Sequence, residues 1–449
     1  MHQSTDIISL QRRTVQGFRA MDDGALLSLA STPELPVSCA DLILCRDHYR
    51  RVEQRDPTFG ELLFLGALFE RCRALPHHTY IAAVTSEQDD DLRSFADLQR
   101  KTAPATAPLS IPQMMQTVGN TLRQVGITPW HEALHCCSIL ELAAQNGDAG
   151  SALSLNGIAA TLQKHGTVAA KTAQTLVLLR GTAAEATRFF AELKRVQHRF
   201  IATVGAEGIF PHLTTLTEGV DLDLTPFREY APQNSFASLP QIGQNGILVA
   251  LPYQYLAYLF SKGFPLAFCG YLTTNRRLTV RIGPEICLSV ATSLLQAVGQ
   301  RVLTPTLSRS EPRCIASGMT VIDGTQVGGI QMTGGCRLEL CRLIASMVAQ
   351  GADLRRVSAT ALLELPLENG DAGVAAALPL LLDLHRVAAE LALPVAQCRV
   401  VSITAGEAPR LTVFLAAEKV SAPREEITAA VSAAAENEDF AALRALLRK

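Results

Sequence analysis

The sequence predicts an α/β fold in which two copies of one module flank a different α/β unit. Three observations favour this fold. The segment Asn-Gly-Asp-Ala-Gly occurs twice, similar helix patterns precede both occurrences, and segments rich in β-forming residues follow them. The segment begins at Asn146 and again at Asn369, an offset of 223 residues. Alternating helices and strands are typical of layered α/β domains.

The helix patterns before the two repeats share their main features. Apolar residues recur every three to four positions over residues 111–125, as on one face of a helix. Ser110 and Gln113 form a predicted capping box, and Gly126 supplies a stop. Apolar residues at the same spacing precede the second repeat, and Gly351 marks the predicted end of that helix. Both repeats are therefore expected to follow an amphipathic helix.

A second helix is predicted after each turn, over residues 149–165 and 372–393. The β-rich segments that follow are 175–179 in the first copy, and 399–403 and 411–415 in the second. We therefore expect residues 111–165 and 336–393 to superpose as helix, strand, turn and helix.

The unit between the copies has its own pattern. A helix is predicted to begin at the capping pair Thr182 and Glu185. Further elements are predicted as strands over residues 246–251, 266–272 and 278–282, and as a helix over 253–262. The turn at residues 273–277 predicts that the last two strands form a hairpin.

These patterns divide the chain into five predicted segments. They are an N-terminal helical linker (1–75), a first α/β subdomain of the repeated type (76–171), a different α/β subdomain (172–305), a second subdomain of the repeated type (306–420), and a C-terminal helical tail (421–449). The tail is predicted as one helix that begins at Ser421, with Pro423 in its first turn.

Composition excludes several classes of protein. The formal net charge is −2 and the sequence has no basic run, so we expect no nucleic-acid partner. The first 15 residues lack the apolar core of a signal peptide, and no apolar run approaches the ~20 residues of a membrane span. The 11 cysteines show no C-x-x-C pair or framework spacing. These features predict a cytoplasmic protein without a membrane partner.

Three stretches, taken in order, carry a family resemblance. They are Arg55-Asp56-Pro57-Thr58-Phe59-Gly60-Glu61-Leu62 running to Glu70-Arg71-Cys72-Arg73, then Glu218-Gly219-Val220-Asp221-Leu222-Asp223-Leu224, and then Leu363 to Ser402. From the first to the last, they span about three quarters of the chain. In this order they resemble the large component of phosphoribosylformylglycinamidine synthase and the wider aminoimidazole-ribotide synthetase superfamily.

The resemblance implies two α/β subdomain pairs whose amino-terminal subdomains join in a shared barrel, with a nucleotide site at the seam. It implies an ATP-dependent carbon–nitrogen ligase of purine biosynthesis, with ATP and Mg²⁺ as cofactors. It also implies assembly with a protein partner or with a second copy of the chain.

The departures from the family pattern concern the residues that catalysis needs. The family's Ser-Glu-His-Cys signature reads Phe69-Glu70-Arg71-Cys72 here, so Arg71 replaces the histidine. An arginine cannot transfer protons near neutral pH. Where the family has Gly-Lys-Asp-Ser, this chain has Cys398 to Ser402, with Arg399 and no acid. No set of catalytic residues can be assembled, and a catalytically degenerate protein is expected.

Four residues are candidates for binding a nucleotide or phosphate. Asp148 and Asp371 each lie in a Gly-bracketed turn before a helix, where they either orient a phosphate or magnesium, or cap the helix. Gly334 and Gly335 precede a predicted helix, whose first backbone amides either cradle an anion or belong to a flexible connection.

The segment from His131 to His135 matches the zinc-binding pattern His-Glu-x-x-His. Pro129 lies where a zinc-protease helix would already be running, and Glu141 is too close to be the usual third ligand. We therefore expect no metal at this segment.

Three functions remain open. The first is a synthetase-like protein that no longer catalyses and acts as a nucleotide-binding or assembly subunit. The second is a remodelled ATP-dependent amide ligase subunit that a partner completes. The third is a zinc hydrolase built on His131, Glu132 and His135.

Overall fold

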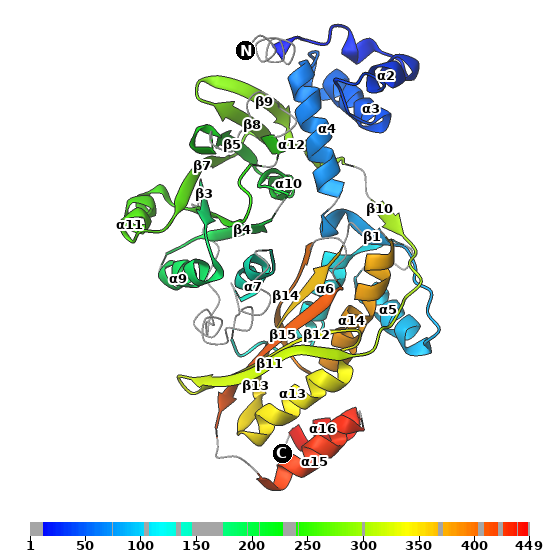
Figure 1. Cartoon of the computed structure of the whole chain (residues 1–449), viewed down its shortest axis with the longest axis vertical. Coiled ribbons are helices and arrows are strands. Elements are labelled where there is room, and N and C mark those ends of the chain that lie inside the picture. The colour runs from blue at the N-terminus through cyan, green and yellow to red at the C-terminus, as the bar shows by residue number, and fades with distance from the viewer. Residues whose placement is uncertain are drawn as a thin grey trace. The chain divides into compact units, whose positions relative to one another are not determined.

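The computed structural model of the chain is an α/β protein (Figure 1). The residues that it describes are 12–73, 75–102, 107–131, 136–145, 174–194, 196–205, 207–227, 239–240, 242–298, 301–366, 371–402, 408–420, 425–437 and 439–447. The chain forms two compact units, each made from two separate stretches. Unit 1 combines Met1–Arg73 with Val168–Gly299, and unit 2 combines Ala74–Thr167 with Gln300–Lys449.

Unit 1 contains a seven-stranded sheet with the order β4-β6-β3-β7-β5-β8-β9. Its strands are β3 (Thr175–Arg180), β4 (Arg199–Val204), β5 (Gly219–Asp223), β6 (Gly246–Leu251), β7 (Leu266–Thr273), β8 (Arg277–Ile282) and β9 (Glu285–Ala291). The helices that follow the strands are α9 (Ala183–Leu193), α10 (Phe210–Leu213), α11 (Leu256–Ser261) and α12 (Thr292–Gln296). The capping box of Thr182 and Glu185 begins α9, as the sequence predicts.

The predicted hairpin of β7 and β8 is wrong, because β5 lies between them. β5 pairs antiparallel with β7 and parallel with β8. The short connection from β7 to β8 crosses the start of β5 at Gly219, where a side chain would collide with Asn275 and Thr273. Glycine at this position leaves the space that the crossing needs.

The N-terminal stretch of unit 1 is helical. It contains α2 (Asp23–Ala30), α3 (Cys39–His48), the π-helical turn η2 (Tyr49–Glu53) and α4 (Phe59–Arg73). Thr58 Oγ1 accepts a hydrogen bond from Glu61 N, and Glu61 Oε2 accepts one from Thr58 N, which caps α4. Buried residues of α3 and α4 join the same hydrophobic core as the seven-stranded sheet.

Unit 2 contains a five-stranded sheet, β11-β12-β15-β13-β14, and a three-stranded sheet, β10-β1-β2. The strands are β1 (Thr79–Ile81), β2 (Leu109–Ser110), β10 (Arg301–Leu303), β11 (Arg313–Ile322), β12 (Thr325–Thr333), β13 (Ala352–Leu365), β14 (Val395–Ser402) and β15 (Arg410–Lys419). The helices are α5 (Asp89–Thr102), α6 (Ile111–Asn120), α7 (Cys136–Gln145), α13 (Arg337–Ala349), α14 (Asp371–Glu390), α15 (Glu425–Glu436) and α16 (Phe440–Leu447).

The expected equivalence of residues 111–165 and 336–393 fails between the first helix and the turn. α13 forms as predicted, and the capping box of Ser110 begins α6, which ends at Asn120 and is followed by a 3-10 turn over Arg123–Val125. However, α7 stands where the second copy has the strand β13. The buried residues Cys137, Ser138, Glu141 and Leu142 have helical spacing, which explains the difference. The first turn (146–150) and its predicted second helix lie outside the described residues.

The C-terminal tail consists of two helices rather than the single predicted one. Asp439 Oδ1 accepts a hydrogen bond from Ala442 N, which caps the start of α16 and interrupts the helical run. α15 and α16 pack on α13 through a small apolar cluster that includes Val431 and Leu443. The predicted cap Ser421 lies outside the described residues.

Among the described helices, one segment, Asp371–Leu391, is long and apolar enough to cross a membrane. Most of this segment is buried, with Leu380 and Leu384 fully enclosed in the core of unit 2. Burial of this kind is typical of the core helix of a globular domain.

Candidate functional site

One face of the five-stranded sheet in unit 2 carries buried polar side chains. On the opposite face, apolar residues of β12, β13 and β15 pack in one core with α13 and α14. At the alternate positions lie Gln331, Glu364 and Thr412, each only 1% exposed. Burying polar groups costs free energy unless they are hydrogen-bonded. A specific network is therefore expected on this face.

The network is centred on the Glu364 carboxylate. Arg410 binds Glu364 Oε2 through Nη2 at 2.7 Å and through Nε at 2.8 Å. Gln331 Nε2 donates to Glu364 Oε1 at 3.1 Å and to Thr412 Oγ1 at 3.2 Å. Charge-assisted bonds of this type are stronger than bonds between neutral groups. Glu364 is therefore engaged by the protein's own cation.

The predicted candidate Gly334 directly follows β12 and is in the left-handed region with φ 82°. A side chain there would collide with the backbone carbonyl of Glu311, so the chain path itself requires glycine. Gly335 follows it, at the start of the α13 segment. The amide of Cys336, the N-cap of α13, donates to Asp383 Oδ2 at 3.1 Å. One of the amides proposed for an anion thus already binds a buried carboxylate.

Arg309 links that carboxylate to a second one. Its guanidinium binds Asp383 with nitrogen–oxygen distances of 2.9 and 3.1 Å, and it binds Asp91 of α5 through Nε at 3.1 Å. Arg337 also approaches Asp383, at 3.4 Å. Asp91 and Asp383 are both buried. Burial acts to lower the pKa of Arg309, but its bonds to the two carboxylates raise the pKa above its usual value.

The candidate Asp371 is the first residue of α14 and is mostly exposed. Its carboxylate lies 3.3 Å from the guanidinium of Arg301 on β10. Gly373 allows the first turn of α14 to approach the carbonyl of Pro366, where a side chain would collide. Both observations agree with a helix-start role for this turn. Asp148, the counterpart of Asp371, lies outside the described residues.

A groove of about 460 Å³ lies between α6 and β14, in unit 2. Its lining includes two arginines, Arg123 and Arg399, which come from parts of the chain that lie far apart in sequence. The other lining residues are Pro112, Gln116, Gly119, Asn120, Val395, Ala396, Gln397 and Cys398. Pockets for small molecules commonly have volumes of about 300–1,000 Å³. The groove therefore has the size and charge to hold an anionic organic ligand.

Arg399 also contacts α7, which covers the polar face of the sheet. Its Nη1 atom donates to Ser138 Oγ at 3.1 Å and lies 3.4 Å from Glu141 Oε2. Arg123 Nη2 donates to the carbonyl of Ala396 at 3.3 Å. Arg399 belongs to the stretch Cys398–Ser402, which has no acid where the family pattern has one. Arg123 was not predicted as a site residue, because nothing near it in sequence suggests that it meets β14.

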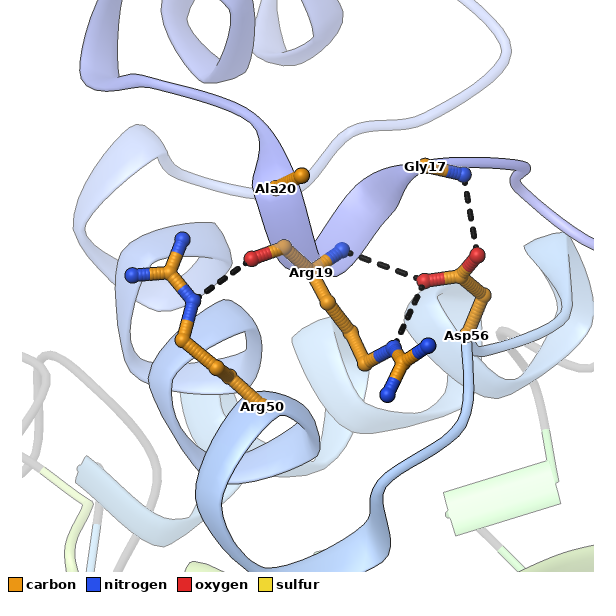
Figure 2. A pocket seen from close by; sticks show the side chains of 5 residues that line it. All are labelled: Gly17, Arg19, Ala20, Arg50 and Asp56. Atoms are coloured by element: carbon orange, nitrogen blue, oxygen red, sulfur yellow. Dashed lines mark hydrogen bonds and ion pairs between the residues drawn. The ribbon is translucent and has the colours of Figure 1, made fainter.

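Unit 1 has a separate hollow of about 430 Å³, which Figure 2 shows with its lining residues. Asp56 accepts hydrogen bonds from the amides of Gly17 and Arg19 and from Arg19 Nε. Burial acts to raise the pKa of Asp56, but these bonds outweigh it and lower the pKa. Arg50 Nε donates to the carbonyl of Arg19 at 2.6 Å. These contacts fix the turn around Arg19.

The motif at residues 55–62, which carries part of the family resemblance, has a structural role here. Arg55 makes a two-point ion pair with Glu61, with distances of 2.7 and 2.6 Å, and also donates to the carbonyl of Ser289. Arg71 is half-buried on α4. Burial lowers the pKa of Arg71, and the carboxylates of Glu70 and Glu207 partly offset this effect. The motif thus anchors α4 to the sheet of unit 1.

The segment predicted not to bind zinc is described only at its first residue. His131 is buried, its amide donates to Ser358 Oγ at 2.6 Å, and its ring packs against Trp130. Residues 132–135 lie outside the described part of the chain. Among the described residues, no group of three His, Cys, Asp or Glu side chains could hold a metal ion.

The folds and the groove define a two-unit α/β protein with a candidate site for an anion. No protein-family model matches the sequence, and a search of curated proteins finds no match. Solved structures from Thermotoga maritima are similar to it. Phosphoribosylformylglycinamidine synthase II is 13% identical, with 89% of each chain covered and a TM-score of 0.44.

Two ligand complexes of the Thermotoga maritima protein PurL give similar values. The complex with FGAR is 11% identical, covers 89% of this chain and 90% of that chain, and has a TM-score of 0.45. The complex with ATP is 12% identical, covers 60% and 61%, and has a TM-score of 0.40. These proteins belong to the family that the sequence resembles.

Proposed function

We propose that this chain is a divergent phosphoribosylformylglycinamidine-synthase-like protein, related to purine biosynthesis, that has lost ligase catalysis and still binds a nucleotide. The observation that carries the proposal is the pairing of carboxylates with arginines in unit 2. The pairs are Asp91 and Asp383 with Arg309, Glu364 with Arg410, Glu141 with Arg399, and Asp371 with Arg301.

This pairing argues against a magnesium site at these carboxylates. Magnesium in phosphoryl-transfer enzymes is held by carboxylates together with the phosphates of the substrate. A carboxylate that already binds an arginine has little charge left to offer, and the guanidinium repels the metal. These arginine-paired carboxylates therefore do not fit Mg²⁺. Arg71 supplies no proton transfer in place of the family's histidine.

The groove between α6 and β14 is the proposed nucleotide site. Arg123 lines the groove, and a guanidinium group is well suited to bind phosphate oxygens. Gln116, Asn120 and Gln397 supply amide groups that could bind the base or the sugar. PurL from Thermotoga maritima has been solved in complex with ATP, with ADP and with AMPPCP, so ATP is the first probe to test.

Reversing the charge at Arg123 is expected to weaken ATP binding at least tenfold. A hydrogen bond between charged groups contributes about 1.5–3 kcal/mol, and about 1.4 kcal/mol corresponds to a factor of ten in affinity. Titration calorimetry of the full chain with ATP would measure the change in the Arg123→Glu variant. Arg123 is exposed, so this substitution leaves the core unchanged.

The control is Arg93→Ala on α5, an exposed arginine away from the groove. It is expected to bind ATP as the unmodified chain does. Equal ATP affinity in the Arg123→Glu variant would remove the groove from the proposal.

A further inference from the structure

Strand β11 forms an open edge of the five-stranded sheet in unit 2 (Figure 1). It runs for 10 residues and pairs only with β12 among the described strands. Its side chains are largely exposed, including the apolar Ile315 at 47% and Val321 at 44%. A long exposed edge strand is a template for pairing with another strand.

This edge lacks most of the features that prevent such pairing. Soluble proteins usually protect an edge strand with proline or with charged residues, especially lysine. The nine residues Cys314–Ile322 contain no charged residue and no proline. The one protective feature is a β-bulge between Cys314 and Ala316, near one end of the strand. The remainder of the edge is regular.

The register shows which backbone groups face outward. Ile322 pairs with Thr325 across the two-residue turn of Asp323 and Gly324, both of which have positive φ. The pair next to such a turn is hydrogen-bonded, and bonded and non-bonded pairs alternate from there. Ser317, Met319 and Val321 therefore direct their N–H and C=O groups to the open edge.

We propose that two copies of this chain associate through β11, with the two strands antiparallel and Gly318 at the two-fold axis. Arg313 begins the strand and Asp323 follows its end, and both are exposed. Antiparallel pairing about Gly318 brings Arg313 of each copy within one residue of Asp323 in the other. A parallel arrangement would instead place Arg313 beside Arg313. The edge is thus complementary to itself in charge.

The same arrangement matches the outward backbone groups. Ser317 of one copy lies opposite Met319 of the other, and both direct their backbone groups to the edge of β11 that pairs with no other described strand. The exposed Ile315 also comes close to Val321 of the second copy. The two five-stranded sheets then form one continuous sheet. This inference is independent of the proposed nucleotide site, because none of these residues lines the groove.

Sedimentation velocity of the full chain, over a range of concentrations, tests the proposal. We expect a dimer for the unmodified chain. Ser317→Lys places two like charges near the two-fold axis and is expected to raise the dimer dissociation constant at least tenfold. Ser28→Lys on α2, also an exposed serine, is the matched control and should leave the dimer intact. A monomeric unmodified chain would overturn the proposal.

Charge exchange tests the orientation of the two strands. Arg313→Glu should weaken the dimer, because it faces Asp323, and the double variant Arg313→Glu with Asp323→Lys should restore it. Far-ultraviolet circular dichroism confirms that each variant is folded. A dimer that both Ser317→Lys and Arg313→Glu leave unchanged would show that another surface forms the contact.

A cross-link tests the register. Gly318 occupies a non-hydrogen-bonded position on the open edge, where paired Cα atoms are about 4.5 Å apart, within the range for a disulfide. In a Cys314→Ser background, Gly318→Cys is expected to give a disulfide-linked dimer on mild oxidation. Ser28→Cys in the same background should not. No cross-link in a folded Gly318→Cys variant would contradict the register.

Discussion

Replacing Arg309 with alanine is expected to destabilise unit 2 by about 3–5 kcal/mol, because it removes the cation that binds two buried carboxylates and leaves Asp383 with the more distant Arg337, at 3.4 Å. Arg309 binds both Asp91 and Asp383, which lie 2% and 4% exposed. Arg309 also helps to hold the Asp383 carboxylate where it accepts the hydrogen bond from Cys336 N at the start of α13. The effect should therefore extend to the helix that covers the apolar face of the sheet.

The single tryptophan of the chain, Trp130, belongs to unit 2 and provides a specific signal. Urea unfolding followed by tryptophan fluorescence would therefore report on this unit. Arg93→Ala is the matched control, since Arg93 lies two residues from Asp91 on α5 and is 77% exposed. Exposed ion pairs contribute at most about 1 kcal/mol. Equal unfolding midpoints for the two variants would contradict the role assigned to Arg309.

Replacing Glu53 with glutamine is expected to destabilise unit 1 by about 3 kcal/mol at neutral pH. The side chain of Glu53 is 3% exposed and accepts hydrogen bonds from Arg277 Nη2 and Ala291 N, both at 2.8 Å. His48 Nε2 lies 3.3 Å away. These contacts join the N-terminal helices to β8 and β9, so their loss should loosen that junction.

The contribution of Glu53 depends on pH. Burial acts to raise the pKa of Glu53, but the bonds from His48, Arg277 and Ala291 outweigh it and lower the pKa to about 2. An unfolded glutamate has a pKa of about 4.3. The folded pKa is lower, so the stabilisation is complete above about pH 4.3 and is lost as the pH falls toward 2.

Hydrogen exchange of β8 and β9 at several pH values would measure this effect. The unmodified chain should lose protection between about pH 4.3 and 2, whereas Glu53→Gln should start less protected and change less over that range. Glu285→Gln, an exposed carboxylate on β9, is the control. The same protection in Glu53→Gln as in Glu285→Gln at pH 7 would refute the assignment.

Local patterns in the sequence predicted local structure well. The capping boxes at Ser110 and Thr182 form as expected, and α6 and α13 follow the predicted stripes. Caps and stripes depend on residues three or four positions apart, so they can be read from the sequence. The order of strands cannot, because it depends on pairing between distant segments. The insertion of β5 between β7 and β8 is the clearest case.

The internal repeat gave one wrong prediction, a strand in the first copy where the structure has α7, because equivalent positions were compared without regard to the spacing of apolar residues. The comparison of the two copies predicts a strand between the first helix and the turn, although Cys137 and Glu141 have the spacing of a helix face. Within the candidate site, the sequence draws attention to Arg399 because the stretch around it lacks the acid of the family pattern. Arg123 was not predicted as a site residue, because Ala396, whose carbonyl accepts its hydrogen bond, is 273 residues away in the sequence. Glu364, a single acid within an apolar strand, was a signal that could have indicated the polar network.

The central claim is that the chain binds a nucleotide without magnesium-dependent catalysis, and calorimetric titration with ATP in the presence and absence of Mg²⁺ tests it most directly. Magnesium reduces the negative charge of ATP, and the proposed site offers arginines rather than carboxylates. ATP should therefore bind without Mg²⁺ at least as tightly as with it, and no heat of turnover should follow. Binding that requires Mg²⁺, followed by steady heat release when formylglycinamide ribonucleotide and ammonia are added, would contradict the account and indicate a remodelled ligase.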